Sequence, residues 1–154
     1  MKIPIPQDNV ERKVVESLNR GELHIIHVGA SDLGPSFSYT IGLTQLHAHP
    51  ELLITELPFQ NANNVLHSAF DRVSEGMRFG HLDKALHVVS AQLPACFLQI
   101  PPDVRDKHLT LASWANGREE FDALQCVWPD RNGLFPWDAE YDPGFHQTIL
   151  AETP

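Results

Sequence analysis

The spacing of apolar residues changes along the chain, and each change predicts a different kind of element. Between residues 10 and 18 the apolar positions recur on one helical face, with Asp8 as a candidate N-cap and Gly21 as a stop. The same period returns over residues 59–75. The sequence therefore predicts two clear helices, and residues 104–115 predict a third, shorter one.

Between these helices, apolar and polar residues alternate or form short apolar runs. Such patterns are typical of strands that are buried on one or both faces. Gly42 interrupts one of them, which predicts a bulge or a close approach of the backbone. The predicted strands are residues 23–28, 37–43, 51–57, 85–92, 96–100, 121–128 and 145–150, with 29–35 as a loop and 45–50 as a polar connection.

These elements predict an α+β fold, because strands that follow one another through short links usually pair as antiparallel neighbours. We expect a mostly antiparallel sheet of about six or seven strands, with two or three helices packed against one face. Residues 1–154 are expected to form a single domain. Residues 1–7 are expected to be an extended N-terminal arm, because Pro4 and Pro6 disfavour helix.

Composition and charge narrow the classes of function. The 154 residues suffice for one domain, and a hydrophobic fraction of 42% is that of a globular chain. A formal net charge of -9 disfavours nucleic acid and anionic membrane surfaces as partners, because both bind clustered cations. The acidic balance suits a basic protein partner, and it equally suits simple solubility.

We expect a cytoplasmic protein, because no apolar run reaches membrane-spanning length and the N-terminus lacks an apolar signal core. Cys96 and Cys126 lie in apolar runs and are expected to be buried free thiols.

Two stretches are dense in aromatic, Pro and Gly residues, and we expect them to meet in space. The first covers residues 35–43 and continues at 49–52, and the second covers 125–138. Large aromatic residues suggest burial, and Pro and Asn-Gly fix tight turns. The sequence thus predicts a site, or a rigid corner of the core, where the two stretches meet.

These stretches resemble a bacterial family catalogued as domain of unknown function 4262. The resemblance covers about residues 20–150, nearly the whole chain. It supports the fold and the position of a site, but it implies no reaction, because the family carries no settled activity. His47 departs from the family pattern, which usually has only the second histidine of His47-Ala48-His49. The matching residues are Pro35, Phe37, 39–43, 49–52, Leu57, Pro58, Gly76, Gln125, 128–130, Gly133, 135–137 and Gln147.

His47, His49 and Glu51 are candidates for metal binding, because alternate residues of an extended segment point the same way. Two imidazoles and a carboxylate can form a facial metal triad, to which His24 or His27 could add a ligand. The alternative is a solvated loop at the entrance of a strand. His49 and Glu51, followed by Asp130, are also the best candidates for general acid/base chemistry.

Other residues of the two stretches are candidates for ligand binding. A phenol, a hydroxyl and a glycine backbone can line a pocket, and two indole rings can form walls around a planar ligand. The alternative is packing alone: a half-buried strand at Tyr39 and a stapled core corner at Trp128 and Trp137. The full set is Tyr39, Thr40, Gly42, His49, Gln125, Trp128, Phe135 and Trp137.

No Gly-x-Ser-x-Gly elbow and no phosphate-binding glycine loop occur, and the apolar setting of Cys126 argues against a nucleophilic thiol. We therefore expect a non-enzymatic binding protein with a protein partner or a small ligand, for example in an immunity or antitoxin role. The alternatives are a hydrolase that uses His49 and Glu51, and a cofactor or nucleotide binder that uses the two Trp residues. The sequence specifies neither a cofactor nor an oligomeric state.

Overall fold

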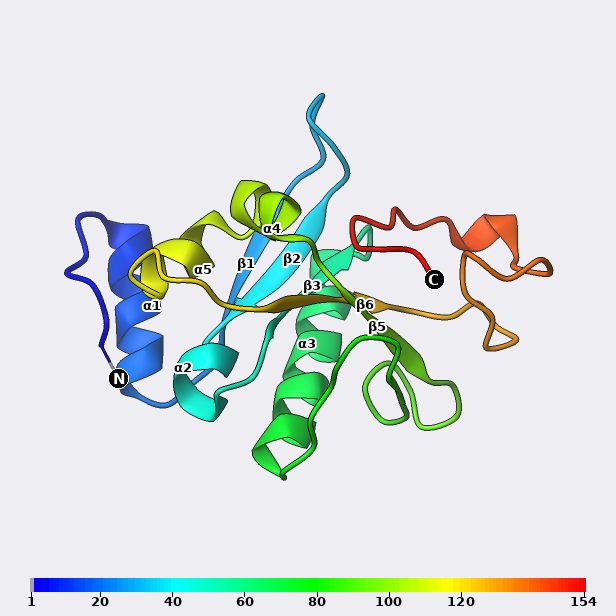
Figure 1. The fold of residues 1–154 in the computed structure, drawn as a ribbon, viewed down its shortest axis with the longest axis horizontal. Helices are drawn as coiled ribbons and strands as arrows, with labels where there is room; N and C mark the ends of the chain where they lie inside the picture. The colour runs from blue at the N-terminus through cyan, green and yellow to red at the C-terminus, as the bar shows by residue number, and fades with distance from the viewer. Residues whose placement is uncertain (1) are drawn as a thin grey trace.

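A computed structural model describes residues 2–154 and contains one twisted sheet of six strands (Figure 1). The strand order is β1-β2-β3-β6-β5-β4. The strands are β1 (His24–Val28), β2 (Phe37–Ile41), β3 (Glu51–Thr55), β4 (Lys84–Ala85), β5 (Ala95–Gln99) and β6 (Ala123–Val127).

The sheet is mixed rather than purely antiparallel. Strands β1, β2 and β3 form an antiparallel meander, as predicted, and β6, β5 and β4 form a second antiparallel group. The two groups join through β3 and β6, which run parallel with Leu53 opposite Gln125. A parallel pair requires a long crossover. Here the crossover contains α3, the strands β4 and β5, and two short helices.

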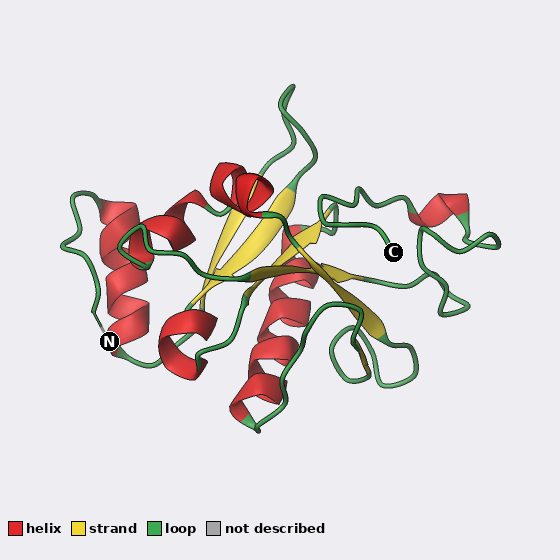
Figure 2. Ribbon diagram, in the orientation of Figure 1, coloured by secondary structure: helices red, strands yellow, loops and turns green. Residues whose placement is uncertain are grey.

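Five α-helices within residues 2–154 surround this sheet, so the prediction of two or three helices was wrong (Figure 2). The pattern missed a helix that begins at Leu43, the last residue of the predicted strand 37–43, and runs into the predicted connection 45–50. It also merged two short helices that meet at Leu109. The helices are α1 (Asn9–Asn19), α2 (Leu43–His47), α3 (Phe59–Ser74), α4 (Pro102–His108) and α5 (Thr110–Ala115), followed by the short 3-10 helix η1 (Pro143–Phe145).

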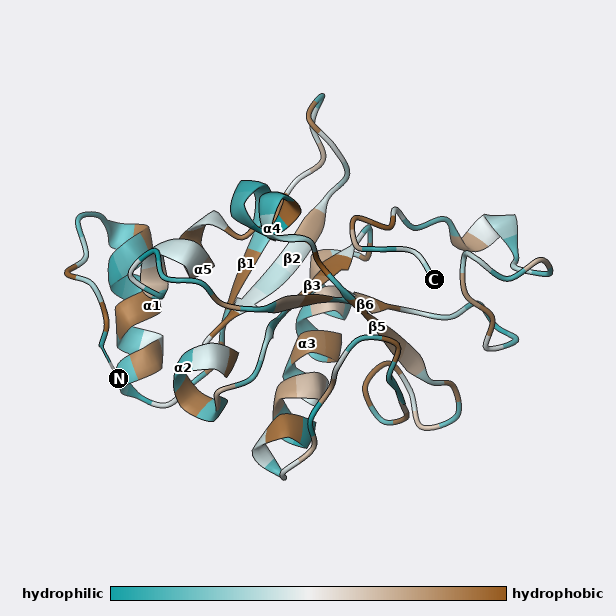
Figure 3. Cartoon of the chain, viewed as in Figure 1, coloured by the Kyte–Doolittle hydropathy of each residue, from teal (hydrophilic) through white to brown (hydrophobic). Residues whose placement is uncertain are grey.

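Helices cover both faces of the sheet, which corrects the expectation that they pack against one. Leu52 and Ile54 of β3 face α3, whereas Leu53 lies in the core beneath α1 and α5. Three consecutive buried apolar residues in one strand require cover on both faces. Figure 3 shows that α1 and α3 each carry both hydrophobic (brown) and hydrophilic (teal) residues along their length.

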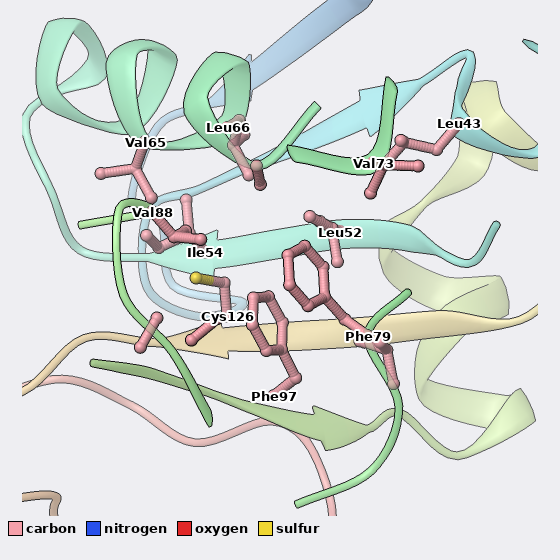
Figure 4. Packing of buried hydrophobic residues seen from close by; sticks show 14 of the residues in the cluster. Leu43, Leu52, Ile54, Val65, Leu66, Val73, Phe79, Val88, Phe97 and Cys126 are labelled. Atoms are coloured by element: carbon pink, nitrogen blue, oxygen red, sulfur yellow. The ribbon is translucent and has the colours of Figure 1, made fainter. Parts of the chain in front are cut away.

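The core on the α3 side is built from aromatic and aliphatic contacts (Figure 4). The rings of Phe79 and Phe97 stack with centroids 4.3 Å apart. Leu66 and Val73 of α3 pack in the same cluster, over β3. This layer fixes the position of α3, whose first turn borders the groove described below.

Two predicted strands are irregular in the structure. In residues 85–92 only Ala85 belongs to a strand, because the Ser90 hydroxyl accepts bonds from the N–H groups of Gln92 and Leu93 and forms a turn. Residues 145–150 pack along the sheet without joining it.

The N-cap predicted at Asp8 is confirmed, whereas Met1 of the predicted extended arm lies outside the described residues. Asp8 caps α1 by accepting a bond from the Glu11 N–H at 2.8 Å, and residues 2–7 precede that cap without helix or strand. Within residues 2–154, no helix combines the length and the apolar character that crossing a membrane requires.

Candidate functional site

Glu51 opens β3 and lies fully buried beneath the turn from β2 into α2. Its Oε1 accepts bonds from the Thr40 hydroxyl at 2.8 Å and the Leu43 N–H at 3.1 Å. Its Oε2 accepts from the N–H groups of Thr44 at 3.0 Å and Gly42 at 3.3 Å. Burial raises the pKa of Glu51, and the bonds from Thr44 and Thr40 oppose that rise. Four converging donors suit an ionised carboxylate that caps α2.

Gly42 makes this arrangement possible. Its φ is +130°, and a Cβ at this position would lie 3.3 Å from Cδ2 of Leu18. The predicted close approach of the backbone at Gly42 is therefore confirmed. Thr40 completes the turn, because its hydroxyl donates to Glu51 and accepts a bond from the Leu52 N–H at 2.9 Å.

His49 is buried and uses both of its ring nitrogens internally. Nδ1 lies 2.8 Å from the Pro50 carbonyl oxygen, and Nε2 accepts a bond from the Phe79 N–H at 3.0 Å. This pattern requires a neutral ring with its proton on Nδ1. Burial accordingly lowers the pKa of His49. The imidazole thus ties the segment around Phe79 to the start of β3.

The other candidate histidines contact different elements. His47 Nε2 lies 3.1 Å from the Ser74 hydroxyl at the end of α3. His24 contacts Ser17 of α1, and His27 contacts Ser38 and stacks on the Phe59 ring at 4.7 Å. Within residues 2–154, no three His, Cys, Asp or Glu side chains are grouped so that they could hold a metal ion. The candidates His47, His49 and Glu51 therefore have separate structural partners.

Asp130 organises the turn that follows β6. Oδ1 accepts bonds from the N–H groups of Asn132 at 2.8 Å and Leu134 at 3.0 Å, and Oδ2 accepts from that of Asp142 at 3.0 Å. Burial would raise the pKa of Asp130, but the backbone bonds outweigh it and lower this pKa. A carboxylate held in this way fixes a turn.

Gln125 attaches the C-terminal segment to the sheet. Its Nε2 donates to the Thr148 carbonyl at 2.8 Å, and its Oε1 accepts from the Leu150 N–H at 2.7 Å. Gln147 acts in a similar way toward Trp128, donating to its carbonyl at 2.6 Å and accepting from its N–H at 3.3 Å. Side-chain amides therefore supply the bonds that a strand ladder would otherwise provide.

Tyr39 is also part of the core. Its ring is buried in the layer beneath α1 and α5, and its hydroxyl accepts a bond from the Leu111 N–H at 3.2 Å. Burial raises the pKa of this phenol. Tyr39 and Gln125 face the same residue of β3, Leu53, from its two sides, so β3 lies between β6 and the part of the first stretch on β2. The continuation of that stretch at residues 51–52 lies on β3 itself, which pairs directly with β6.

The aromatic residues of the second stretch divide between the two faces of the sheet. Trp128 belongs to the α3 layer, and its indole N–H donates to the Thr55 carbonyl at 3.2 Å. Phe135 and Trp137 stack at 5.2 Å in a separate cluster with Val127. The two indole rings therefore do not face each other across one ligand.

One open groove borders the predicted site residues, and we name it the Trp128 groove. It has a volume of about 460 Å³ and adjoins a second hollow of about 380 Å³, with Leu57 shared by both. These volumes are typical of ligand sites. Its walls come from the first turns of α3, the loop before β5, the end of β6 and the C-terminal segment. The main lining residues are Leu57, Asn61, Asn64, Trp128, Pro129 and Phe145.

Sequence reasoning found Trp128 but missed the two asparagines and Phe145. Asn61 and Asn64 lie one helical turn apart and are exposed, so they fall outside the apolar face by which α3 was recognised. Both lie beside Val65, a buried residue of α3, on the helix surface. This spacing could have indicated that the two asparagines lie at the border between core and solvent. The pattern of residues 145–150 instead predicts a strand that contains Phe145.

The fold and these contacts can now be set beside known proteins. The family model described as "Domain of unknown function (DUF4262)" matches residues 18–142, about four fifths of the 154 residues. The match includes Glu51, His49, Trp128 and Asp130, and it confirms the resemblance seen in the sequence. No curated protein and no solved structure matches the chain. The chain therefore belongs to the DUF4262 family.

Proposed function

We propose that this chain is a non-enzymatic binding protein that holds an extended peptide segment of a protein partner in the Trp128 groove. The observation that carries the proposal is that the polar candidate residues are hydrogen-bonded inside the protein, whereas one aromatic candidate lines an open groove. Glu51, His49 and Asp130 use their polar atoms in internal hydrogen bonds. Trp128, in contrast, borders an open groove.

The chemistry of the groove suits a peptide. A carboxamide presents a donor and an acceptor side by side, which is what a peptide group requires from its partner. Asn61 forms no side-chain hydrogen bond among residues 2–154, and Asn64 shares only its oxygen, with Gln60 at 3.1 Å. The apolar lining from Leu57, Trp128 and Phe145 suits one large side chain of the bound segment.

We propose an extended conformation for the bound peptide because the Trp128 groove continues into the neighbouring hollow. The neighbouring hollow continues past Leu57 toward Pro58 and the exposed ring of Phe59. A chain that occupies both hollows lies across the first turn of α3. The acidic net charge favours a partner with basic residues beside that segment. We place this binding in the cytoplasm, where the buried free thiols Cys96 and Cys126 remain reduced.

The contrast with the hydrolase alternative supports this proposal. A general base needs a lone pair that a substrate proton can reach. The Nε2 lone pair of His49 is directed at the Phe79 N–H, and the oxygens of Glu51 receive four donors. Cys126 is equally unsuited as a nucleophile, because burial raises its pKa to about 12.

The test selects linear peptides from a displayed library against the folded protein and then measures affinity in variants. Asn61→Ala combined with Asn64→Ala should weaken the selected peptides by about tenfold or more, because each lost hydrogen bond is worth roughly 1 kcal/mol. Asn19→Ala, an exposed asparagine at the end of α1, is the matched control and should leave affinity unchanged. Equal affinity in the double variant, or failure to select any peptide, would overturn the proposal.

A further inference from the structure

Another hollow lies along the hairpin between β1 and β2. It shares no lining residue with the Trp128 groove and only Gly29 with the hollow beside that groove. It has a volume of about 440 Å³, within the range of small-molecule sites. Apolar side chains form most of its lining, and two residues from the end of α4 complete it. We name it the hairpin pocket and define it by Val28, Leu33, Pro35, Phe37, Lys107 and His108.

We infer that the hairpin pocket binds a small organic carboxylate with an apolar body. Phe37 and Pro35 supply the apolar lining, and Lys107 supplies a cation at its border. Lys107 forms no ion pair in the part of the chain that the structure describes. An ammonium group beside an apolar hollow suits a ligand that has one anionic end and one apolar end.

His108 adds a second polar group whose ring is held in place. Its Nδ1 donates to the Val104 carbonyl at 2.8 Å, and its ring meets the edge of Phe37 with centroids 5.2 Å apart. Nε2 makes no hydrogen bond to any of residues 2–154, and it donates to a carboxylate in the protonated ring, whereas it accepts in the neutral ring. The exposed acids nearest in sequence, Asp32 and Asp106, are not among the lining residues.

Charge at this position has a second interpretation, because cations at the end of a helix also stabilise its dipole. The two interpretations differ in what Lys107 does for a ligand. If Lys107 only stabilises the dipole of α4, its replacement will change thermal stability slightly, and the pocket will bind charged and neutral probes equally well. If Lys107 binds the carboxylate of a ligand, the pocket will bind an acid more tightly than its neutral amide.

Fluorine-observed NMR with para-fluorobenzoate and para-fluorobenzamide tests the inference on the full chain. We expect the acid to bind more tightly than the amide. Lys107→Gln should weaken the acid by about tenfold, as expected when a charge-assisted hydrogen bond is lost, and should leave the amide unaffected. Lys13→Gln removes the same charge from α1 and is the matched control.

The inference would be overturned by no binding of the acid at millimolar concentration, by equal binding of acid and amide, or by equal loss in both lysine variants. The variant Leu33→Asn locates the site independently of charge. Leu33 is 97% exposed, so its replacement should not affect folding, but it should weaken the acid and the amide alike. Unchanged binding of both probes in this variant would place them outside the hairpin pocket and contradict the assignment.

Discussion

At the scale of single residues, polar side chains in the most conspicuous stretches of this sequence act mainly as internal connectors. Glu51 joins β3 to α2, His49 joins β3 to the segment around Phe79, and Asp130 closes the turn after β6. Each combines a buried position with several hydrogen bonds. Such residues resemble catalytic groups in sequence because both kinds are polar residues among apolar neighbours.

Glu51→Gln should lower the free energy of unfolding by about 2–4 kcal/mol, because the new NH₂ group faces N–H donors that then lose their acceptor. Urea unfolding followed by circular dichroism measures this difference. Glu119→Gln, an exposed glutamate, is the control and should change stability little. Wild-type stability in the Glu51→Gln variant would contradict the capping role of the carboxylate.

Asp130→Asn should make stability less dependent on pH in the acid range. The pKa of Asp130 is lowered from 3.8, so its contribution is present above that pH and is lost as the pH falls through the lower, folded-state pKa. Thermal melts across acid pH should therefore show the wild type and the variant converging at the lowest pH. As a control, the melting temperature of Asp32→Asn should follow that of the wild type at every pH. A difference between Asp130→Asn and the wild type that stays constant with pH would contradict the role of an ionised Asp130 in the turn.

Gln45 is the one side chain in residues 2–154 whose buried amide atoms find no hydrogen-bond partner. Burial without a partner costs free energy, so Gln45→Met, which keeps the length and removes the polar atoms, should stabilise the fold by about 1 kcal/mol. Calorimetric melting temperatures provide the measurement. A destabilised Met variant would mean that this amide makes favourable contacts that the fold depends on.

At the scale of elements, sequence patterns succeed where burial is regular and fail where side chains replace backbone pairing. The period of α3 and the alternation of β2 placed both within a few residues of their observed bounds. Residues 145–150 look like a strand because their apolar residues pack on the sheet. Gln125 supplies their hydrogen bonds, and that contact joins residues far apart in the chain, so the local pattern does not reveal it.

Gly42→Ala tests the turn that connects β2 with α2. A Cβ at φ +130° is strained and meets Leu18, so we expect a loss of about 1–3 kcal/mol in unfolding free energy. Gly29→Ala is the matched control, because Gly29 has no positive φ and nothing lies within 4 Å of its added Cβ. Similar stability of the two variants would show that this turn tolerates a side chain.

At the scale of the whole molecule, the sequence indicated the α+β class and a mostly antiparallel sheet, but it did not reveal how the two halves of the sheet join. The parallel contact of β3 with β6 links residues about seventy positions apart. The packing of helices on both faces of the sheet could have been predicted from Leu52, Leu53 and Ile54, because three consecutive apolar residues in one strand must be buried on both sides. The open groove was not, because it forms only where α3, β6 and the C-terminal segment converge.

The most direct test of the central claim follows the three indole N–H signals by NMR while a selected peptide is added. Trp128 lines the groove, whereas Trp114 and Trp137 pack in other clusters and act as internal controls. The account predicts that the Trp128 signal shifts in proportion to the bound fraction while the other two stay in place. A peptide that binds and shifts Trp137 or Trp114 but not Trp128 would contradict it.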